Sequence, residues 1–368
     1  MNKPPIPFYD ASKTFDVNID EGPFGAFAKA KPTKAKTKPA YTFLGYKINF
    51  PIGIAAGPLP SSRHIRGAFN MGFDVNIYKT QRTTPVPANP FPNVIPIDVK
   101  GNVTLKDSEK GLIMRDSFPT DLSELTITNS FGNPSRGPKF WIEDVEKAIA
   151  YEGEGQLLIV SVCGTIREKQ SKDEYYQDFA DAAKLAYDAG AKAIELNLSC
   201  PNAANEGILC YSPEAGEDIC KKVRKVIGET PLIVKFGYFS EEQESTLEKI
   251  LRKITPYVQA IAVINTIPAA IYTKDGTQAL PGEGRLKSGL CGAGIKWAGI
   301  DMVKRLNKLR KTKKYTFEII GVGGVMTPED FFDYRKAGAD VVMSCTGAMW
   351  NPYLAQEIKN KQNVILKS

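Results

Sequence analysis

One cysteine of this chain has the setting of a reactive group. It lies in the segment ELNLSCPN (195–202), where an apolar run ends at Asn197 and Cys200 and Asn202 follow. A thiol can act as a base because its ordinary pKa is about 8.5 and cationic neighbours lower it. A buried structural cysteine is the default alternative. The polar neighbours and the position at the end of an apolar run favour a functional Cys200.

The chain contains one histidine, His64, in the segment SSRHIRG. Histidine is the commonest general base near neutral pH. Its context predicts the exposed start of a helix, so we expect a surface residue and not a catalytic one. Acid–base chemistry is then left to Cys, Lys, Asp or Glu.

Polar residues and glycines close several other apolar runs. Two of them are lysines, Lys79 and Lys235, and lysines are rarely buried without a partner. They predict an anionic or electron-rich ligand, with two internal salt bridges as the alternative. The whole set of such positions is Ala55, Ala56, Gly57, Lys79, Thr80, Ser161, Asn197, Lys235, Asn265, Thr266, Gly323, Gly324, Thr346 and Gly347.

The last two glycine-containing turns have the pattern of a phosphate site. GVGG (321–324) precedes a helical pattern that starts at TPEDFF, and SCTG (344–347) precedes one in NPYLAQEI. Glycines let the backbone approach a ligand, and N–H groups near helix starts face an anion. We therefore predict a phosphorylated ligand such as FMN or a sugar phosphate.

Eight short apolar runs would hold these residues in place. Most are nearly continuous, which is typical of parallel strands buried on both faces. Helical patterns separate them; one has a Ser212 cap and stops at Gly228, and another ends at Gly338. The alternation predicts an α/β fold, a TIM (β/α)8 barrel. The runs are 51–57, 73–80, 156–164, 191–201, 231–237, 258–267, 317–324 and 339–347.

Two long segments, 81–138 and 268–290, interrupt this alternation. The first contains strand-like pieces in NVIPIDV, NVTL and LTITNSFG. Loops after barrel strands build the active-site face, so we expect both inserts to cover the site. Residues 1–40 lack clear periodicity, and we expect an N-terminal extension around the exterior of one barrel domain, 41–368.

The composition narrows the class of partner. A net charge of +7 over 368 residues is mild, and the densest basic cluster, KAKPTKAKTKP (29–39), is interrupted by prolines. Without aromatic interleaving it predicts a solvated linker and no nucleic-acid partner. No apolar run approaches the ~18 residues of a membrane span, and no signal-peptide pattern opens the sequence. We therefore predict a cytoplasmic protein with no membrane contact.

The six cysteines lie far apart and form no CxxC pair. This spacing predicts neither a zinc site nor a disulfide framework, and we expect no bound metal. Cys163, Cys220 and Cys345 lie in apolar or helical patterns and are predicted to serve packing.

Taken together, the motifs resemble those of dihydroorotate dehydrogenases from about residue 42 to 355. NLSCPN, IAAG, YKT, TNSFGNPS, VK, INT, SGLCG, GVGG and the closing TG occur in matching order. Quinone-linked members carry serine in place of the cysteine, so the sequence resembles the class 1 branch. Dihydropyrimidine dehydrogenases have a similar FMN domain and cysteine and are the alternative. A catalytically silent barrel that only binds ligand is a third hypothesis.

The resemblance implies FMN-dependent oxidation of (S)-dihydroorotate to orotate in de novo pyrimidine (UMP) biosynthesis. Cys200 would remove the C5 proton while hydride passes from C6 to flavin N5, and Lys235 would lie near the flavin N1–C2 carbonyl. Substrate contacts are implied for Lys79, Asn129, Phe131, Gly132, Asn133, Asn197, Asn202, Asn265 and Thr266. FMN contacts are implied for Ala55, Ala56, Gly57, Lys79, Thr80, Ser161, Asn197, Lys235, Gly292, Gly323, Gly324, Thr346 and Gly347.

The electron acceptor is left open by the sequence. Fumarate would require only this chain, whereas NAD would require a partner subunit with FAD and an iron–sulfur cluster. The chain has neither a dinucleotide fingerprint nor clustered cysteine ligands, which argues against direct NAD use. Because class 1 relatives are commonly dimers, a homodimer is expected. The loop AANEGILCYSPE (203–214) departs from the family pattern and adds Cys210 as a second candidate thiol.

Overall fold

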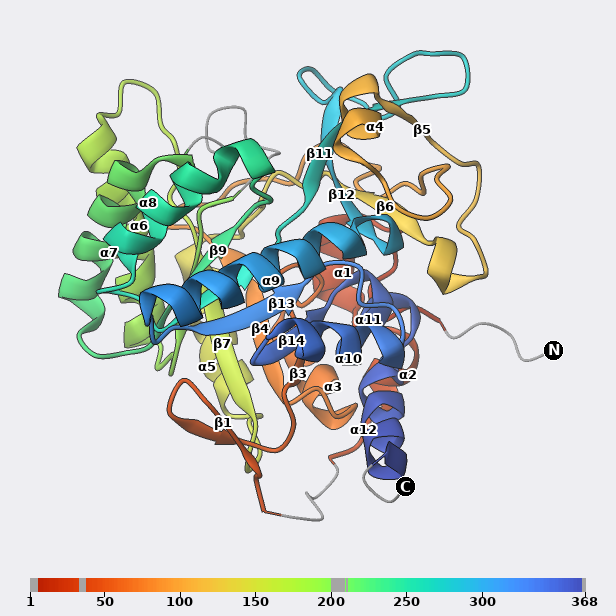
Figure 1. Ribbon diagram of the computed structural model, residues 1–368. Helices are drawn as coiled ribbons and strands as arrows, with labels where there is room; N and C mark the ends of the chain where they lie inside the picture. The colour runs from red at the N-terminus through yellow and green to blue at the C-terminus, as the bar shows by residue number, and fades with distance from the viewer. Residues whose placement is uncertain (1–5, 33–37, 200–208, 210, 366–368) are drawn as a thin grey trace.

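The eight predicted strands form one closed barrel in the computed structural model, which describes residues 6–32, 38–199, 209 and 211–365. Neighbouring strands are parallel, and β14 closes the barrel by pairing with β3 (Figure 1). The prediction of a TIM barrel is confirmed. The barrel strands are β3 (Ile52–Ile54), β4 (Val75–Gln81), β7 (Leu157–Val162), β8 (Ile194–Asn197), β9 (Leu232–Phe236), β10 (Ala260–Val263), β13 (Glu318–Val322) and β14 (Val341–Ser344).

A helix follows each barrel strand and packs on the outside of the barrel. The predicted boundaries hold where caps define them: Ser212 accepts from the Ala215 N–H and Gly228 ends that helix, while Thr327 and Gly338 bound another. The ring consists of α3 (Ser62–Asn70), α5 (Pro138–Ile149), α6 (Lys172–Asp188), α7 (Pro213–Ile227), α8 (Glu244–Ile254), α9 (Lys296–Lys313), α10 (Pro328–Ala337) and, after β14, α11 (Thr346–Trp350) and α12 (Leu354–Ile365).

A short hairpin closes the end of the barrel where its strands begin. It consists of β1 (Tyr41–Phe43) and β2 (Tyr46–Ile48), joined by Leu44 and Gly45 with φ of 52° and 80°. Two positive φ values are the geometry of a two-residue hairpin turn. Phe43, Leu44 and Ile48 are buried with the strand residues of the barrel interior. The Leu44 N–H donates to Glu318 Oε2 at 2.6 Å, so the polar backbone of this plug is paired as well.

The two inserts meet in a second sheet at the opposite end, as Figure 1 shows. Its strand order is β5-β11-β12-β6, from β5 (Leu112–Ile113), β6 (Thr126–Asn129), β11 (Ile267–Tyr272) and β12 (Lys287–Gly292). Of the three strand-like pieces, only LTITNSFG contains a strand, which is β6 (Thr126–Asn129). NVIPIDV contributes isolated bridges at Pro96 and Ile97. The prediction for NVTL is wrong, because Thr104 caps α4 (Leu105–Lys110) in a capping box with Asp107.

Residues 6–32 contain two short helices, α1 (Phe15–Glu21) and α2 (Gly25–Lys29). They do not simply wrap the exterior: Phe8 and Phe27 stack at 4.0 Å between ring centroids and belong to the main core. Arg63 of α3 donates to the Ile19 and Asp20 carbonyls and holds the end of α1. The single-turn helices are η1 (Leu122–Glu124), η3 (Glu241–Gln243) and η4 (Ala293–Ile295).

The prediction of an exposed His64 is wrong, because the N-terminal segment covers it. The side chain is fully buried, and its ring lies 6.4 Å from the Phe8 ring. Nδ1 shares a hydrogen bond of 2.8 Å with Ser61 Oγ. Burial, together with nearby Arg63, lowers the pKa of His64 to about 3, so the imidazole is neutral.

Candidate active site

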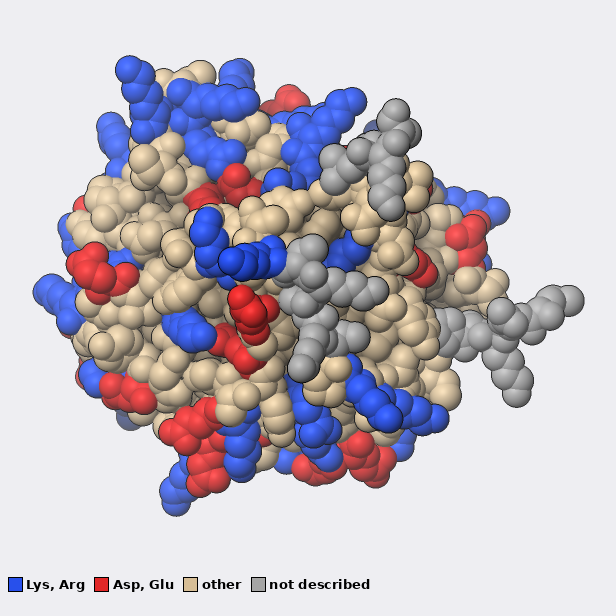
Figure 2. All heavy atoms as spheres, turned by 90° about the horizontal axis from the view of Figure 1, so that it is seen from below, with Lys and Arg blue, Asp and Glu red and all other residues tan. Residues whose placement is uncertain are grey.

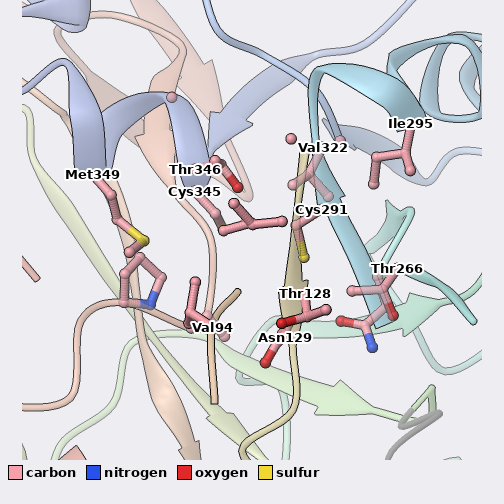
Figure 3. A pocket seen from close by; sticks show the side chains of 18 of the residues that line it. Val94, Thr128, Asn129, Thr266, Cys291, Ile295, Val322, Cys345, Thr346 and Met349 are labelled. Atoms are coloured by element: carbon pink, nitrogen blue, oxygen red, sulfur yellow. The ribbon is translucent and has the colours of Figure 1, made fainter. Parts of the chain in front are cut away.

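A pocket opens at the carboxyl ends of the barrel strands, between the insert sheet and the N-terminal segment. The space not filled by protein is about 1080 Å³, counting the part open to solvent. Figure 3 shows side chains from β6, β12 and the start of α11 facing this space. The first insert, 81–138, therefore lines the site as expected. No residue of the second insert, 268–290, lines the pocket; the residues that flank it, Thr266, Cys291 and Gly292, do. The predicted residues that line it are Ala56, Gly57, Lys79, Asn129, Phe131, Asn133, Asn197, Lys235, Asn265, Thr266, Gly292, Gly323, Gly324, Thr346 and Gly347.

Four predicted residues lie beside the pocket without lining it: Ala55, Thr80, Gly132 and Ser161. Thr80 Oγ1 lies 3.0 Å from Ser161 Oγ and 3.5 Å from Asn197 Nδ2, so these hydroxyls support Asn197 from below. The position of Thr80 and Ser161 indicates that they act on the site indirectly, through Asn197.

Cys200, Asn202 and Cys210 lie outside the described residues. Ser199, the last described residue before Cys200, is buried, and its carbonyl accepts from Asn265 Nδ2. Its N–H donates to Asn197 Oδ1 at 3.2 Å. Both partners line the pocket, so Ser199 lies at the pocket edge.

The two lysines differ in their surroundings. Lys79 Nζ donates to Asn133 Oδ1 at 3.3 Å and to the Thr80 carbonyl at 3.4 Å. Lys235 is 3% exposed and lines the pocket, yet it forms no hydrogen bond or ion pair with any described residue. An internal salt bridge therefore does not explain why Lys235 is buried. A buried ammonium without a partner is costly unless a ligand supplies the missing negative charge.

Other polar atoms at the pocket are also unpaired within the described part of the chain. They are Thr266 Oγ1, Asn133 Nδ2 and the Tyr9 hydroxyl. Buried polar groups are nearly always hydrogen-bonded in native proteins. Three orphaned groups around one cavity therefore fit a polar ligand that completes them.

Glycines allow close packing on both sides of the loop after β13: Gly324 packs against the start of α9, and Gly347 at the start of α11 packs against Val325. Gly324 has a φ of 67°, and a Cβ there would lie 2.6 Å from Lys296 Cβ. A Cβ at Gly347 would lie 2.1 Å from the Val325 carbonyl oxygen. Tyr334 donates to the Gly323 carbonyl at 2.6 Å and anchors the first loop. With no side chain between the two backbones, the loops fit the predicted phosphate cradle.

The apolar side of the pocket was not predicted from the sequence. Tyr9 and Phe15 of the N-terminal segment line it, and both rings contact Phe131, at 5.9 and 6.2 Å between centroids. No sequence pattern marks these two residues, because residues 1–40 have no clear periodicity. Val94, Ile127, Met326 and Met349 complete this apolar side.

Two thiols also line the pocket. Burial raises the pKa of Cys291 to about 12 and that of Cys345 to about 11, so both are neutral and poor bases. Cys345 packs against the interior core of the barrel as predicted, and it also lines the pocket. Cys163 and Cys220 are buried as expected.

Other classes of site are absent from the described residues. They contain no group of three His, Cys, Asp or Glu side chains placed to hold a metal ion. No helix among residues 6–32, 38–199 and 211–365 has the length and hydropathy to span a bilayer. On the face shown in Figure 2, basic and acidic side chains are both spread over the surface.

The fold and site define a class: a (β/α)8 barrel with an unpaired cation in its pocket and glycine loops after its last two strands. The family model for dihydroorotate dehydrogenase matches residues 118–366. A dihydroorotate dehydrogenase from Dictyostelium discoideum is 37% identical over 363 residues, which cover 96% of this chain and 97% of that protein. The chain belongs to the dihydroorotate dehydrogenase family, and hence to the flavin-dependent oxidoreductases acting on CH–CH bonds.

More distant relatives differ in the acceptor that their names give. The catalytic subunit of dihydroorotate dehydrogenase B (NAD(+)) from Methanocaldococcus jannaschii is 30% identical over 226 residues, 61% of this chain and 67% of that protein. Dihydroorotate dehydrogenase A (fumarate) from Limosilactobacillus reuteri is 28% identical over 197 residues, 51% of this chain and 57% of that protein.

Proposed function

We propose that this protein oxidises (S)-dihydroorotate to orotate, with FMN as its cofactor and Cys200 as the base. The observation that carries this proposal is the buried, unpaired Lys235 in the same pocket as the glycine cradle of Gly324 and Gly347. FMN has an electron-rich ring, with which a cation can interact, and a phosphate, which glycine loops can hold. Family membership supplies the reaction that uses it.

Gly323, Gly324, Thr346 and Gly347 would hold the FMN phosphate, and Lys235 would face the polar edge of the ring. When bound, FMN accepts hydride. The ammonium of Lys235 would then lie where negative charge develops, and little reorganisation would be needed during the reaction. Ala56 and Gly57 offer small residues against which a flat ring can lie.

The substrate would lie among Asn129, Asn133, Asn197, Asn265 and Thr266. Amide side chains both donate and accept, which suits the imide edge of a pyrimidine ring. Thr266 Oγ1 and Asn133 Nδ2 can each form a hydrogen bond with the substrate, since neither has a partner among the described residues. Lys79 would orient the substrate, and Phe131 with Gly132 would meet its carboxylate. Asn202 is assigned to the ring by resemblance.

In this scheme Cys200 removes the C5 proton of dihydroorotate. Cys291 and Cys345 are unsuited to this task, because burial raises the pKa of both thiols. Cys210 is the remaining candidate. It follows Cys200 in the sequence, and both residues lie outside the described part of the chain.

An anaerobic reductive titration tests the function. We expect the flavin of the purified protein to lose its visible absorbance with dihydroorotate and not with dihydrouracil. Bleaching by dihydrouracil alone would instead make the protein a dihydropyrimidine dehydrogenase. A protein that binds flavin but is bleached by neither would be a binding module.

Variants test the base. Cys200→Ala should slow flavin reduction by about 10²–10⁴-fold, the range for loss of a general base, without loss of bound flavin. Cys210→Ala tests the second thiol, and Cys220→Ala, which changes a buried thiol of helix α7, is the matched control. Equal rates for Cys200→Ala and wild type would contradict the assignment.

Four further properties belong to this proposal: compartment, oligomeric state, domain organisation and electron acceptor. We propose a cytoplasmic homodimer whose subunit is one barrel domain, 41–368, with residues 1–40 as its extension. The electron acceptor stays open between fumarate, which needs only this chain, and NAD, which needs a partner subunit. Reoxidation by fumarate, NAD or a soluble quinone, each alone, tests the acceptor, and sedimentation tests the dimer. Turnover with NAD only after a second protein is added would indicate an electron-transfer subunit.

A further inference from the structure

A buried carboxyl group lies beneath the pocket and has no role in the scheme above. Glu195 belongs to β8 and is fully buried. Its neighbours Ile194 and Leu196 pack in the core outside the barrel, so the alternation of a strand turns Glu195 to the barrel interior. Oε1 accepts from Ser161 Oγ at 2.8 Å, whereas Oε2 has no hydrogen-bond partner among the described residues.

A chain of hydroxyls connects this carboxyl group with the pocket. Ser161 Oγ lies 3.0 Å from Thr80 Oγ1, and Asn197 Nδ2, which lines the pocket, lies 3.5 Å from the same Thr80 oxygen. Hydroxyls both donate and accept, so such a chain can pass a proton in either direction. Glu195 is closed to solvent but linked to the site.

The charge of Glu195 is balanced against that of Lys235. Burial raises the pKa of Glu195, and Lys235 and the Ser161 hydrogen bond lower it in part. Cys345 is the other titratable group whose charge couples to this carboxyl, and burial keeps that thiol neutral. Lys235 and Glu195 form no ion pair in direct contact within the described residues. The ammonium therefore stands between a carboxyl below and a ligand above.

We propose that Glu195 is a redox-linked proton site, which takes up one proton when the flavin in this pocket is reduced and releases it on reoxidation. Hydride from the substrate brings negative charge to the ligand side of Lys235. The same ammonium then serves two negative groups, so an ionised Glu195 becomes less stable. Its carboxylate takes a proton from solvent through the hydroxyls of Thr80 and Ser161, with Asn197 bonded to Thr80 at the pocket side, and becomes a carboxylic acid; no bond to the flavin forms or breaks. The inference rests on flavin binding as proposed above.

Proton counting during anaerobic reduction of the flavin-loaded protein tests this. A pH indicator in weakly buffered solution reports the protons taken up per flavin, for wild type and for Glu195→Gln. We expect wild type to take up as much as one proton more than the variant. In the proposal, the pKa of Glu195 is higher in the reduced protein than in the oxidised protein. The difference in proton uptake should appear at pH values between these two pKa values and vanish at lower and at higher pH.

Two further variants make the result specific. Glu318→Gln removes another carboxyl whose pKa burial raises, at the opposite end of the same barrel, and should take up as many protons as wild type. Ser161→Ala removes a hydrogen bond that lowers the pKa of Glu195. The pH range in which this variant takes up an additional proton should therefore lie higher than in wild type. If Glu195→Gln does not fold, the reduced-minus-oxidised infrared spectrum of wild type must show a new carboxylic acid band that shifts in D₂O.

The outcomes separate the two proposals. Normal flavin binding and reduction by dihydroorotate, with equal proton uptake in wild type and Glu195→Gln at every pH, would overturn the role of Glu195 alone. A missing carboxylic acid band would do the same. A protein that binds no flavin would overturn the proposed function and this inference with it.

Discussion

The two ends of the barrel are built from the same eight strands but satisfy their polar groups differently. At the end where the strands begin, the hairpin of β1 and β2 inserts Phe43 and Ile48, and even the strained Leu44 backbone donates to Glu318. At the end where the strands finish, Lys235 and Thr266 Oγ1 have no partner among the described residues. Asn49 Oδ1, which directly follows β2, is unpaired as well within the described part of the chain. What indicates a ligand site at the pocket end is that several unpaired groups surround one cavity there, since such groups are costly.

This contrast separates residues that stabilise from residues that bind. Apolar burial at the hairpin end contributes to folding whether or not a ligand is present. The unpaired groups at the pocket end oppose folding of the ligand-free protein, and they become favourable when a ligand pairs with them. Substitutions at the two ends should therefore change different measurements.

The largest effect on stability is expected at the hairpin end. Phe43 is fully buried, so Phe43→Ala should lower the free energy of unfolding by about 3–5 kcal/mol. Flavin and orotate affinity should stay unchanged in the protein that remains folded. Urea unfolding and ligand titration measure the two quantities, with Tyr353→Ala, which is 46% exposed, as the control. A loss of ligand affinity without a loss of stability would break the contrast.

Lys235→Met should do the reverse at the pocket end. Loss of a charge placed where negative charge develops should slow flavin reduction by about 10²–10³-fold. The ligand-free protein should be as stable as wild type or more stable, because an unpaired buried cation is removed. Stopped-flow reduction and thermal unfolding without flavin check this pair of expectations. A destabilised variant with normal reduction would make Lys235 a structural residue.

The pH dependence of stability tests whether the N-terminal segment keeps His64 buried in solution. The His64 pKa of about 3 in the folded protein lies below the ordinary 6.5, so below pH 6.5 only the unfolded chain binds the proton. Stability should fall as the pH drops from about 6.5 towards 3, with a slope that approaches ~1.4 kcal/mol per pH unit. In His64→Gln this part of the slope should be missing. Unfolding of both proteins at a series of pH values measures the difference, and parallel curves would mean that His64 is not buried in solution.

The smallest effect is expected at Tyr9. Its hydroxyl is buried and unpaired among the described residues, so Tyr9→Phe should leave the stability of the ligand-free protein unchanged. A lost hydrogen bond to the ligand would weaken binding by about 0.5–1.5 kcal/mol, or roughly 2- to 10-fold. Calorimetric titration with flavin and with orotate shows which ligand is affected. Lower stability with unchanged affinity for both would place the hydroxyl with the stabilising groups.

Most of the fold could be predicted from local sequence. The eight apolar runs and the caps at Ser212 and Thr327 are local signals, since strand alternation and helix capping act between neighbouring residues. The inserts were harder: NVTL reads as a strand from its β-branched residues, but the reciprocal hydrogen bonds of Thr104 and Asp107 start a helix there.

The candidate site was predictable to the extent that it lies at strand ends. Lys79, Asn197 and Lys235 each end an apolar run, and a barrel brings all strand ends together. Tyr9 and Phe15 end no such run. They reach the pocket because α1 packs against the barrel, an arrangement set by contacts far apart in the sequence.

The sequence by itself determined the barrel, the family and the residues at its mouth, because period, capping and motif order are properties of the chain. Only the tertiary structure decided that His64 is buried, that Cys345 faces the pocket and that Glu195 lies beneath Lys235 with one oxygen unpaired. Burial and charge balance depend on which segments pack over a residue. That packing joins positions such as Phe8 and His64, or Ser161 and Glu195, whose contact no local pattern records.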